Sequence, residues 1–539
     1  MLTDIANEDS RLSLWLRVRR FAVPPSMIET ATVRRSAGDW AGACAAAAVD
    51  VDLDLRSVAR ARGQDFAGQV RCDLRHLAPD LLRWHMPRIA PHGLLRPGLT
   101  IPLARYGASD RAGPRSGTVQ LVARTAPAWA DAGQRMSLAL WDGAAKDVGA
   151  RRHPHPRPSR RFRLDLHRHL WDTRTTGELR ARSGADREPG QVSPPVPAEV
   201  LELAALYGPC AVDRWGAEAA ILLGSLGRPT DHVVVRLGAR QRLLLSPVAD
   251  EGSPEPPGFT VAGAPTRGVA ALPVLPDAST WTLPDLELIR SGRMEAGRLH
   301  PLVASALAPR HAAHPRPKPE SSSDGETDGR GDGARDRAGE HYAAGAAERV
   351  RTPVTAFAAD HAEVSEPTRR GRSRDSGRAS GALPNAGTGP PRRPGHPYVV
   401  ECRGEQHRIG MVDGALSALD HGPDEIRREE LLAELTGTPL PCLQAIDTAH
   451  RRPDCLTGVR ERLQHGDVAG ALAVVEDLLG PDAVLRDGAL RDELKAAARR
   501  RVAHGLYRTD LDGPGPGRVL PGPTRPKDHR SSPRHASSR

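Results

Sequence analysis

The chain of 539 residues carries a net charge of +10, but only four of its 76 basic residues are lysine. Such an arginine excess, with abundant alanine, glycine and proline, is typical of a GC-rich bacterial genome and is weak evidence for nucleic-acid binding. Six scattered cysteines exclude a disulfide framework, no apolar run approaches the ~20 residues of a membrane span, and the acidic start lacks the basic region of a signal peptide, so we expect a cytoplasmic protein that does not enter a membrane.

The first expected domain, residues 1–183, combines helices with a sheet. A capping-box pattern at Ser26 and Glu29 predicts a helix that begins at Met27. Further helical patterning covers residues 40–48 and 64–89. Strand signals cover 99–105, 118–125, 134–141 and 161–167, and the alternation at 49–55 predicts either a half-buried strand or an extended entry to the next helix. This pattern indicates an α+β region with a mixed, mostly antiparallel sheet.

Residues 195–308 are expected to form a second α+β unit after a break rich in proline and glycine. All eight tryptophans precede residue 282, which marks residues 1–308 as the principal folded region. We expect helices at 198–207, 213–226 and 283–307 and strands at 232–237 and 240–245. The sequence leaves open whether residues 1–308 are one domain or two.

Residues 309–397 are rich in proline, glycine, serine and charge and nearly empty of large apolar side chains. They cannot bury enough apolar surface to offset their ordering entropy, so we predict a long disordered linker. We predict a disordered basic tail at 509–539 for the same reason. Arginines in the linker could bind nucleic acid non-specifically through its phosphates; these are Arg369, Arg370, Arg372, Arg374 and Arg378.

Residues 398–508 are predicted to be a mainly α domain that begins with a β-hairpin. The hairpin strands are expected at 398–402 and 406–412. Helices should follow at about 423–435, 438–450, 456–465, 468–479 and 488–507.

The segments 38–45 and 466–473 match at six of eight positions. In both, glycine should end one helix and aspartate should cap the next. One interpretation is a helical-hairpin repeat that builds an interaction surface. The other, which we favour with only two copies present, is a common turn in an alanine-rich sequence.

Two motifs resemble phosphoryl-transfer or hydrolase signatures. Asp50 and Asp52 resemble, over a few residues only, the paired aspartates of haloacid-dehalogenase-like phosphatases, but Asp54 stands where those enzymes have Thr or Val. We therefore favour a solvated strand face. Ser225 lies in a Gly-Ser-Leu-Gly run, where the first glycine is adjacent to the serine, so the end of a helix explains it better than a nucleophile elbow.

Histidine and cysteine residues offer two candidate metal clusters. The densest histidine group is His153, His155, His167 and His169, and a strand would place the last two on one face. The C-terminal domain offers Cys402, His407, Cys442, His450, Cys455 and His465. Their spacings are not the C-x₂-C of structural zinc modules, so we expect surface or structural histidines and buried, apolar cysteines in both places. Glu405 and His407 are a weak candidate acid/base pair.

No constellation supports a catalytic, cofactor-binding or metal assignment, and no cofactor is expected. The first hypothesis is a cytoplasmic, non-enzymatic interaction or scaffolding protein whose partner is a protein docking on the helical C-terminal domain. The alternatives are a nucleic-acid-associated protein tethered through its arginine-rich segments and an unrecognised enzyme.

Overall fold

The computed structural model describes most of the two predicted folded regions. The described residues are 2–107, 118–130, 132–143, 153, 155–186, 196–238, 241–247, 259–263, 271–309, 398–509 and 511. The predicted linker from residue 310 onward, with the five arginines named above, and the predicted tail from residue 512 onward lie outside them. Contacts group residues 1–315 and 393–539 as one unit. The domain boundaries proposed above stay predictions.

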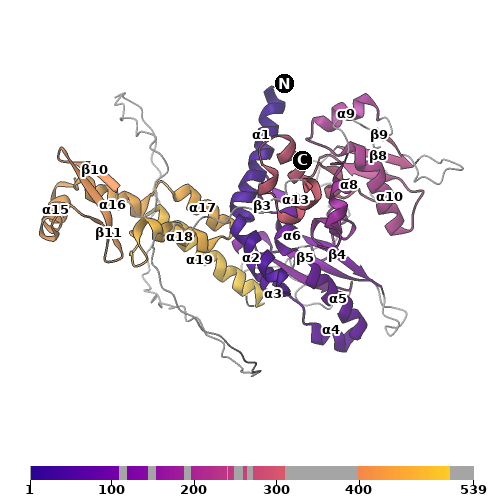
Figure 1. Cartoon of the computed structure of the whole chain (residues 1–539), viewed down its shortest axis with the longest axis horizontal. Helices are drawn as coiled ribbons and strands as arrows, with labels where there is room; N and C mark the ends of the chain where they lie inside the picture. Colours follow the sequence, from indigo (N-terminus) through magenta and orange to yellow (C-terminus); the bar gives the residue numbers. More distant parts are fainter. Residues whose placement is uncertain are drawn as a thin grey trace, which may run out of the picture. The chain divides into compact units, whose positions relative to one another are not determined.

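The first region is α+β, as predicted (Figure 1). Its main sheet has the order β1-β6-β5-β4, in which β1 runs parallel to β6 and the other pairs are antiparallel. The strands are β1 (Val49–Val51), β4 (Thr100–Tyr106), β5 (Val119–Thr125) and β6 (Met136–Trp141), with a short pair β2 (Arg88–Ile89) and β3 (Leu94–Leu95). The helices are α1 (Leu2–Arg17), the π-helical turn η1 (Val18–Ala22), α2 (Pro25–Ser36), α3 (Trp40–Ala46), α4 (Leu55–Arg62), α5 (Gln64–His76), α6 (Pro79–His85) and α8 (Leu179–Ser183).

Three local predictions in this region are wrong. The expected helix at 64–89 is divided into α5 and α6, because Leu77 and Ala78 between them are extended. Helix α2 begins at Pro25 with Pro24 at the N-cap and no side-chain cap, so Ser26 does not start a capping box. The expected strand at 161–167 is replaced by the 3-10 turns η4 (Leu164–Leu166) and η5 (Arg168–Leu170). The indole Nε1 of Trp171 donates to the Leu164 carbonyl at 3.0 Å, which closes this segment on itself and makes it compact.

The second unit has its own small antiparallel sheet. The order is β7-β8-β9, made from β7 (Val233–Arg236), β8 (Arg242–Pro247) and β9 (Phe259–Gly263). Helices α9 (Ala198–Ala205) and α10 (Trp215–Leu226) supply apolar residues to its core. The expected helix 283–307 is divided into α12 (Pro284–Arg290) and α13 (Pro301–Leu307), after the short α11 (Asp277–Thr280). Residues of α12 and α13 pack into the core of the first region instead.

Residues 398–508 form the predicted hairpin, a third strand and five helices (Figure 1). The strands are β10 (Tyr398–Cys402), β11 (Glu405–Val412) and β12 (Ala415–Ala418), paired antiparallel in this order. The helices are α15 (Pro423–Thr436), α16 (Pro441–Arg451), α17 (Leu456–His465), α18 (Val468–Leu479) and α19 (Ala489–Arg508). Two separate buried clusters hold this region: one joins the sheet to α16, and the other is built mainly from α17, α18 and α19.

The repeated octapeptide forms the same turn twice. Asp39 and Asp467 cap α3 and α18, and their carboxylates accept hydrogen bonds from Gly42 N at 2.8 Å and Gly470 N at 2.9 Å. A Cβ at Gly42 or Gly470 would lie 2.1 or 2.3 Å from an oxygen of the capping carboxylate, which would have to shift. The aspartate of the match therefore has the same capping role in both copies.

Candidate metal centre

Four potential metal ligands come from four different elements of the C-terminal region. Cys402 ends β10, His407 lies in β11, His421 immediately precedes Gly422, the N-cap of α15, and Cys442 is the second residue of α16. The turn Arg403-Gly404 has φ values of 58° and 85°, the conformation of a two-residue type I′ hairpin. Because Val400 pairs with His407 across this hairpin, Cys402 and His407 are diagonal neighbours on one face of the sheet.

The donor atoms of these four side chains all lie within 4.8 Å of one another. The Nδ1 atom of His407 is 2.7 Å from Nε2 of His421, and Cys402 Sγ is 3.8 Å from the same Nε2. Both cysteines are fully buried and His421 is buried, while His407 is half-buried. The site is therefore a closed cluster with one side chain near solvent.

The surroundings suit a bound cation. The second ring nitrogen of His421, Nδ1, is 3.2 Å from the Glu425 carboxylate, so a carboxylate orients this imidazole as is usual around ligating histidines. Cys442 lies in the first turn of α16, where free backbone N–H groups favour a thiolate. Burial, together with the adjacent Cys402, raises the pKa of the Cys442 thiol to about 11 in the metal-free protein. Metal binding would have to release this proton.

The donor set fits Zn²⁺ better than other common metals. Two thiolates and two imidazoles are one of the standard sets for structural zinc, and the two thiolates would neutralise its charge. Calcium and magnesium prefer oxygen ligands, which this cluster lacks among its four donors. Four protein ligands also complete a tetrahedral shell, so no position is left open for a substrate.

Three of these four residues, Cys402, His407 and Cys442, were candidates on sequence, but their spacing differs from C-x₂-C and predicted no metal site. His421 was not among the candidates. The cluster instead has the spacing C-x₄-H-x₁₃-H-x₂₀-C. His450, Cys455 and His465 lie outside it. The sequence did contain a signal for this site. The Arg403-Gly404 turn aligns Cys402 with His407, His421 precedes a helix that begins with proline, and Cys442 is the second residue of another such helix.

The four N-terminal histidines form no comparable group in the described part of the chain. His153 Nε2 lies 3.0 Å from the Thr125 carbonyl, the buried His169 lies in η5, and the buried His167 lies between η4 and η5. His167 Nε2 is 2.6 Å from Ser279 Oγ and 3.1 Å from Glu218 Oε2. A catalytic triad needs the hydroxyl and the carboxylate on opposite ring nitrogens, so this is not its geometry.

Glu218 belongs to a buried ion-pair network. Arg182 donates to both of its carboxylate oxygens, at 2.6 and 2.7 Å. Burial alone would raise the pKa of Glu218, but the hydrogen bonds from His167 and Arg182 lower it far below its usual range. The carboxylate therefore stays charged and serves to connect α8, α10 and the 3-10 turns.

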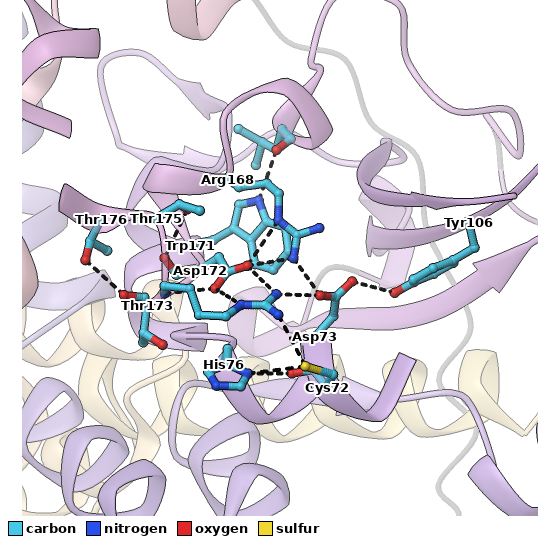
Figure 2. A network of polar contacts seen from close by, with 12 residues as sticks. Cys72, Asp73, His76, Tyr106, Arg168, Trp171, Asp172, Thr173, Thr175 and Thr176 are labelled. Carbon is cyan, nitrogen blue, oxygen red and sulfur yellow. Dashed lines mark hydrogen bonds and ion pairs between the residues drawn. The ribbon is translucent and has the colours of Figure 1, made fainter. Parts of the chain in front are cut away.

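A second polar network connects α5 with the segment after η5 (Figure 2). Arg168 and Arg174 each bridge Asp73 and Asp172, with N–O distances of 2.6 to 2.7 Å. Tyr106 donates to Asp73 at 2.9 Å. Burial alone would raise the pKa of Asp172, but hydrogen bonds from Arg174 and Arg168 lower it. Two carboxylates and two guanidinium groups neutralise one another here, which indicates a structural brace.

The remaining sequence candidates have structural partners. Asp50 accepts from Arg135 at 2.5 and 3.2 Å, and Asp54 is the N-cap of α4. Ser225 lies in the last turn of α10, where its hydroxyl donates to the Leu222 carbonyl at 2.7 Å, before Gly227 ends the helix in a left-handed conformation. Glu405 and His407 lie on β11 as expected, and His407 belongs to the metal cluster.

Comparison with protein-family models, with curated proteins and with solved structures gives no match to this chain. In the part of the chain that the structure describes, no helix is both long and apolar enough to span a membrane.

Proposed function

We propose that the C-terminal region is a zinc-stabilised structural module of a non-enzymatic interaction protein. The observation that carries this proposal is the closed Cys402–His407–His421–Cys442 cluster, whose four donors converge within 4.8 Å. Four protein ligands with an oriented second shell are typical of structural zinc, whereas a catalytic zinc keeps an open position.

The small apolar core around the cluster supports a structural role. Its buried members are Cys402, Ile409, Ala418, Leu440, Cys442 and Ile446. Two of these six are the proposed ligands themselves, so only three large aliphatic side chains are buried here, and the other apolar residues that pack against them are partly exposed. Regions with so little apolar burial usually need a metal or a disulfide for stability, and all six cysteines of the chain are free.

Metal analysis of the full chain tests the proposal directly. Protein purified without chelator should contain one Zn²⁺ per chain, and the stoichiometry should fall to near zero in Cys442→Ser but not in Cys455→Ser. Cys455 is a matched control, because it lies in the same region but outside the cluster. A chain that binds no Zn²⁺ after reduction and dialysis against Zn²⁺ would refute the proposal.

Helix α15 gives the interaction role a candidate surface. None of its residues is buried, and Leu431, Leu432 and Leu435 are 58%, 48% and 85% exposed. Helical spacing places Arg428, Leu431, Glu434 and Leu435 on one face. If two such helices pair antiparallel about Leu431, Arg428 of each faces Glu434 of the other. We therefore propose a second copy of the chain as the occupant of this face.

Sedimentation equilibrium of the full chain tests this pairing over a concentration series. The chain should dimerise reversibly, and Leu435→Glu should stay monomeric. Val484→Glu is the control, because Val484 is equally exposed, at 86%, but lies outside α15. Arg428→Glu and Glu434→Arg should each weaken the dimer, and the double variant should restore it. A monomer at all concentrations would refute the pairing and leave the zinc proposal standing.

A further inference from the structure

The two cysteines of the metal cluster lie close enough to react with each other. Their sulfur atoms are both among the donors that lie within 4.8 Å of one another, and they come from segments 40 positions apart in the chain. Each sits at an end of its element: Cys402 at the last position of β10, next to a two-residue turn, and Cys442 in the first turn of α16. Ends of elements move more easily than their middles, so the remaining approach to bonding distance requires only a local shift.

The oxidant would enter by the His407 side. Both cysteines are 0% exposed and His421 is only 8% exposed, whereas His407 is half-buried. A small oxidant such as a peroxide can follow this edge of the site, whereas a bulky disulfide such as oxidised glutathione cannot reach a buried sulfur. The geometry therefore selects the class of oxidant.

We infer that this centre is a peroxide-sensitive switch in which oxidation joins Cys402 to Cys442 and expels the metal. The inference rests on the proposed zinc site. One thiolate attacks a peroxide oxygen, the O–O bond breaks, and a sulfenic acid and hydroxide form. The second thiolate attacks the sulfenic sulfur, the S–S bond forms and a second hydroxide leaves. Two protons from solvent convert the hydroxides to water, so two thiolates and one hydrogen peroxide give one disulfide, two waters and free Zn²⁺.

Oxidation should remove the metal and also change which elements of the module are connected to one another. The metal would connect β10, β11, the segment before α15 and α16 at one point, whereas the disulfide connects only β10 and α16. His407 and His421 then lose their common partner. The restraint on β11 and on the start of α15 is therefore released, while the link between the sheet and α16 becomes covalent.

The test uses the zinc-loaded full chain and hydrogen peroxide. A colorimetric zinc chelator should report release of one equivalent of Zn²⁺, and non-reducing peptide mapping should find Cys402 joined to Cys442. Reduction by a dithiol with added Zn²⁺ should restore the starting state. Oxidised glutathione at the same concentration should release zinc at least tenfold more slowly. Cys455→Ser should behave as the unaltered chain.

A ligand-preserving variant separates thiol chemistry from loss of a ligand. Cys442→His keeps a potential zinc ligand but cannot form the disulfide, so its zinc release by peroxide should be at least tenfold slower. Peptide mapping of the unaltered chain decides the question even if this variant binds zinc poorly. Retention of zinc under peroxide, or cysteine sulfinic acids in place of the disulfide, would overturn the switch while leaving the zinc site intact. A chain without zinc would overturn the proposed function instead.

Discussion

Loss of one ligand should unfold the sheet of the C-terminal module and spare its helical core. The perturbation is Cys442→Ser in the full chain, or removal of zinc by a chelator. The apolar contribution that remains comes mainly from Ile409, Leu440 and Ile446. At about 2 kcal/mol for each buried aliphatic side chain, these residues supply about 6 kcal/mol. Structural zinc in small modules contributes about 10–16 kcal/mol, which exceeds the contribution of these three side chains.

Hydrogen exchange followed by mass spectrometry localises this effect. Tryptophan fluorescence cannot, because all eight tryptophans precede residue 282. Amides of β10, β11 and β12 should lose their protection in Cys442→Ser or after chelation. Amides of α17, α18 and α19 should keep most of theirs, because a different buried cluster holds these helices.

Two matched pairs control for ordinary core damage. Cys455→Ser removes a partly buried thiol outside the cluster, and His450→Ala removes a histidine that is 6% exposed, compared with 8% for His421. Neither control should deprotect the β-sheet, whereas His421→Ala should. Equal deprotection by His421→Ala and His450→Ala, or an unchanged sheet after complete removal of zinc, would refute the reasoning.

Three further predictions concern stability elsewhere in the chain. Burial lowers the pKa of His85 to about 4, although Asp285 opposes the shift and His300, Arg19 and Arg88 reinforce it. The unfolded chain binds this proton near pH 6.5, so the contribution of His85 to the free energy of unfolding is fully present above that pH and falls by about 3 kcal/mol as the pH drops to 4. Urea unfolding followed by tryptophan fluorescence at several pH values measures this dependence. In His85→Gln its slope should decrease by about one proton. Asp285→Asn should lower the free energy of unfolding by about 3–5 kcal/mol in the same assay, since it removes the nearer counter-charge of the buried Arg19 guanidinium, 3.7 Å away, and leaves only the weaker interaction with Asp80; a change near zero would contradict that view. Asp467→Ala and Asp39→Ala should each cost about 1 kcal/mol through loss of a helix cap, and a thermal melt unchanged in both variants would show that these caps are dispensable.

Local signals were sufficient for most of the fold. The strands at 99–105, 118–125 and 134–141 have apolar residues at every second position and are bounded by glycine or proline, and the structure has β4, β5 and β6 there within a residue or two. The five C-terminal helices were also predictable, because three of them end at a glycine with positive φ, namely Gly437, Gly466 and Gly480. Here local preference and tertiary packing favour the same conformation.

The strand expected at 161–167 failed because tertiary contacts decide the conformation of this segment. Residues 161–167 alternate like a strand, but Leu164, Leu170 and Trp171 are all buried, and only short 3-10 turns place them together in the core. Strand β12 was missed although Asp413-Gly414, with φ values of 48° and 77°, is a standard hairpin turn. Recognising that turn would have placed β12 beside β11 and brought His421, three residues after β12, close to His407.

The metal cluster illustrates why spacing alone is an incomplete guide to metal sites. A C-x₂-C pair works because one tight turn brings both sulfurs together, and its sequence separation is short for that reason. Here a two-residue hairpin brings Cys402 and His407 together, while the closure of β12 and α16 onto the sheet supplies His421 and Cys442. Two of the four ligands thus depend on tertiary packing, which pairwise spacings do not encode.

The packing of β12 also determines how far the structural effect of metal loss extends into the C-terminal region. Leu416 on β12 packs against both buried clusters of the C-terminal region, the one that contains Cys402 and Cys442 and the one formed by α17 to α19. Unfolding of β12 therefore exposes one apolar contact of the helical core without removing its seven fully buried members. Because Leu416 is only partly buried, this loss is smaller than the value of about 1.5–3 kcal/mol for a fully buried leucine, and the helices should become less stable but stay folded. Loss of the metal would then change the structure of the sheet, including β12, and of the surface of α15, while α17 to α19 keep their structure.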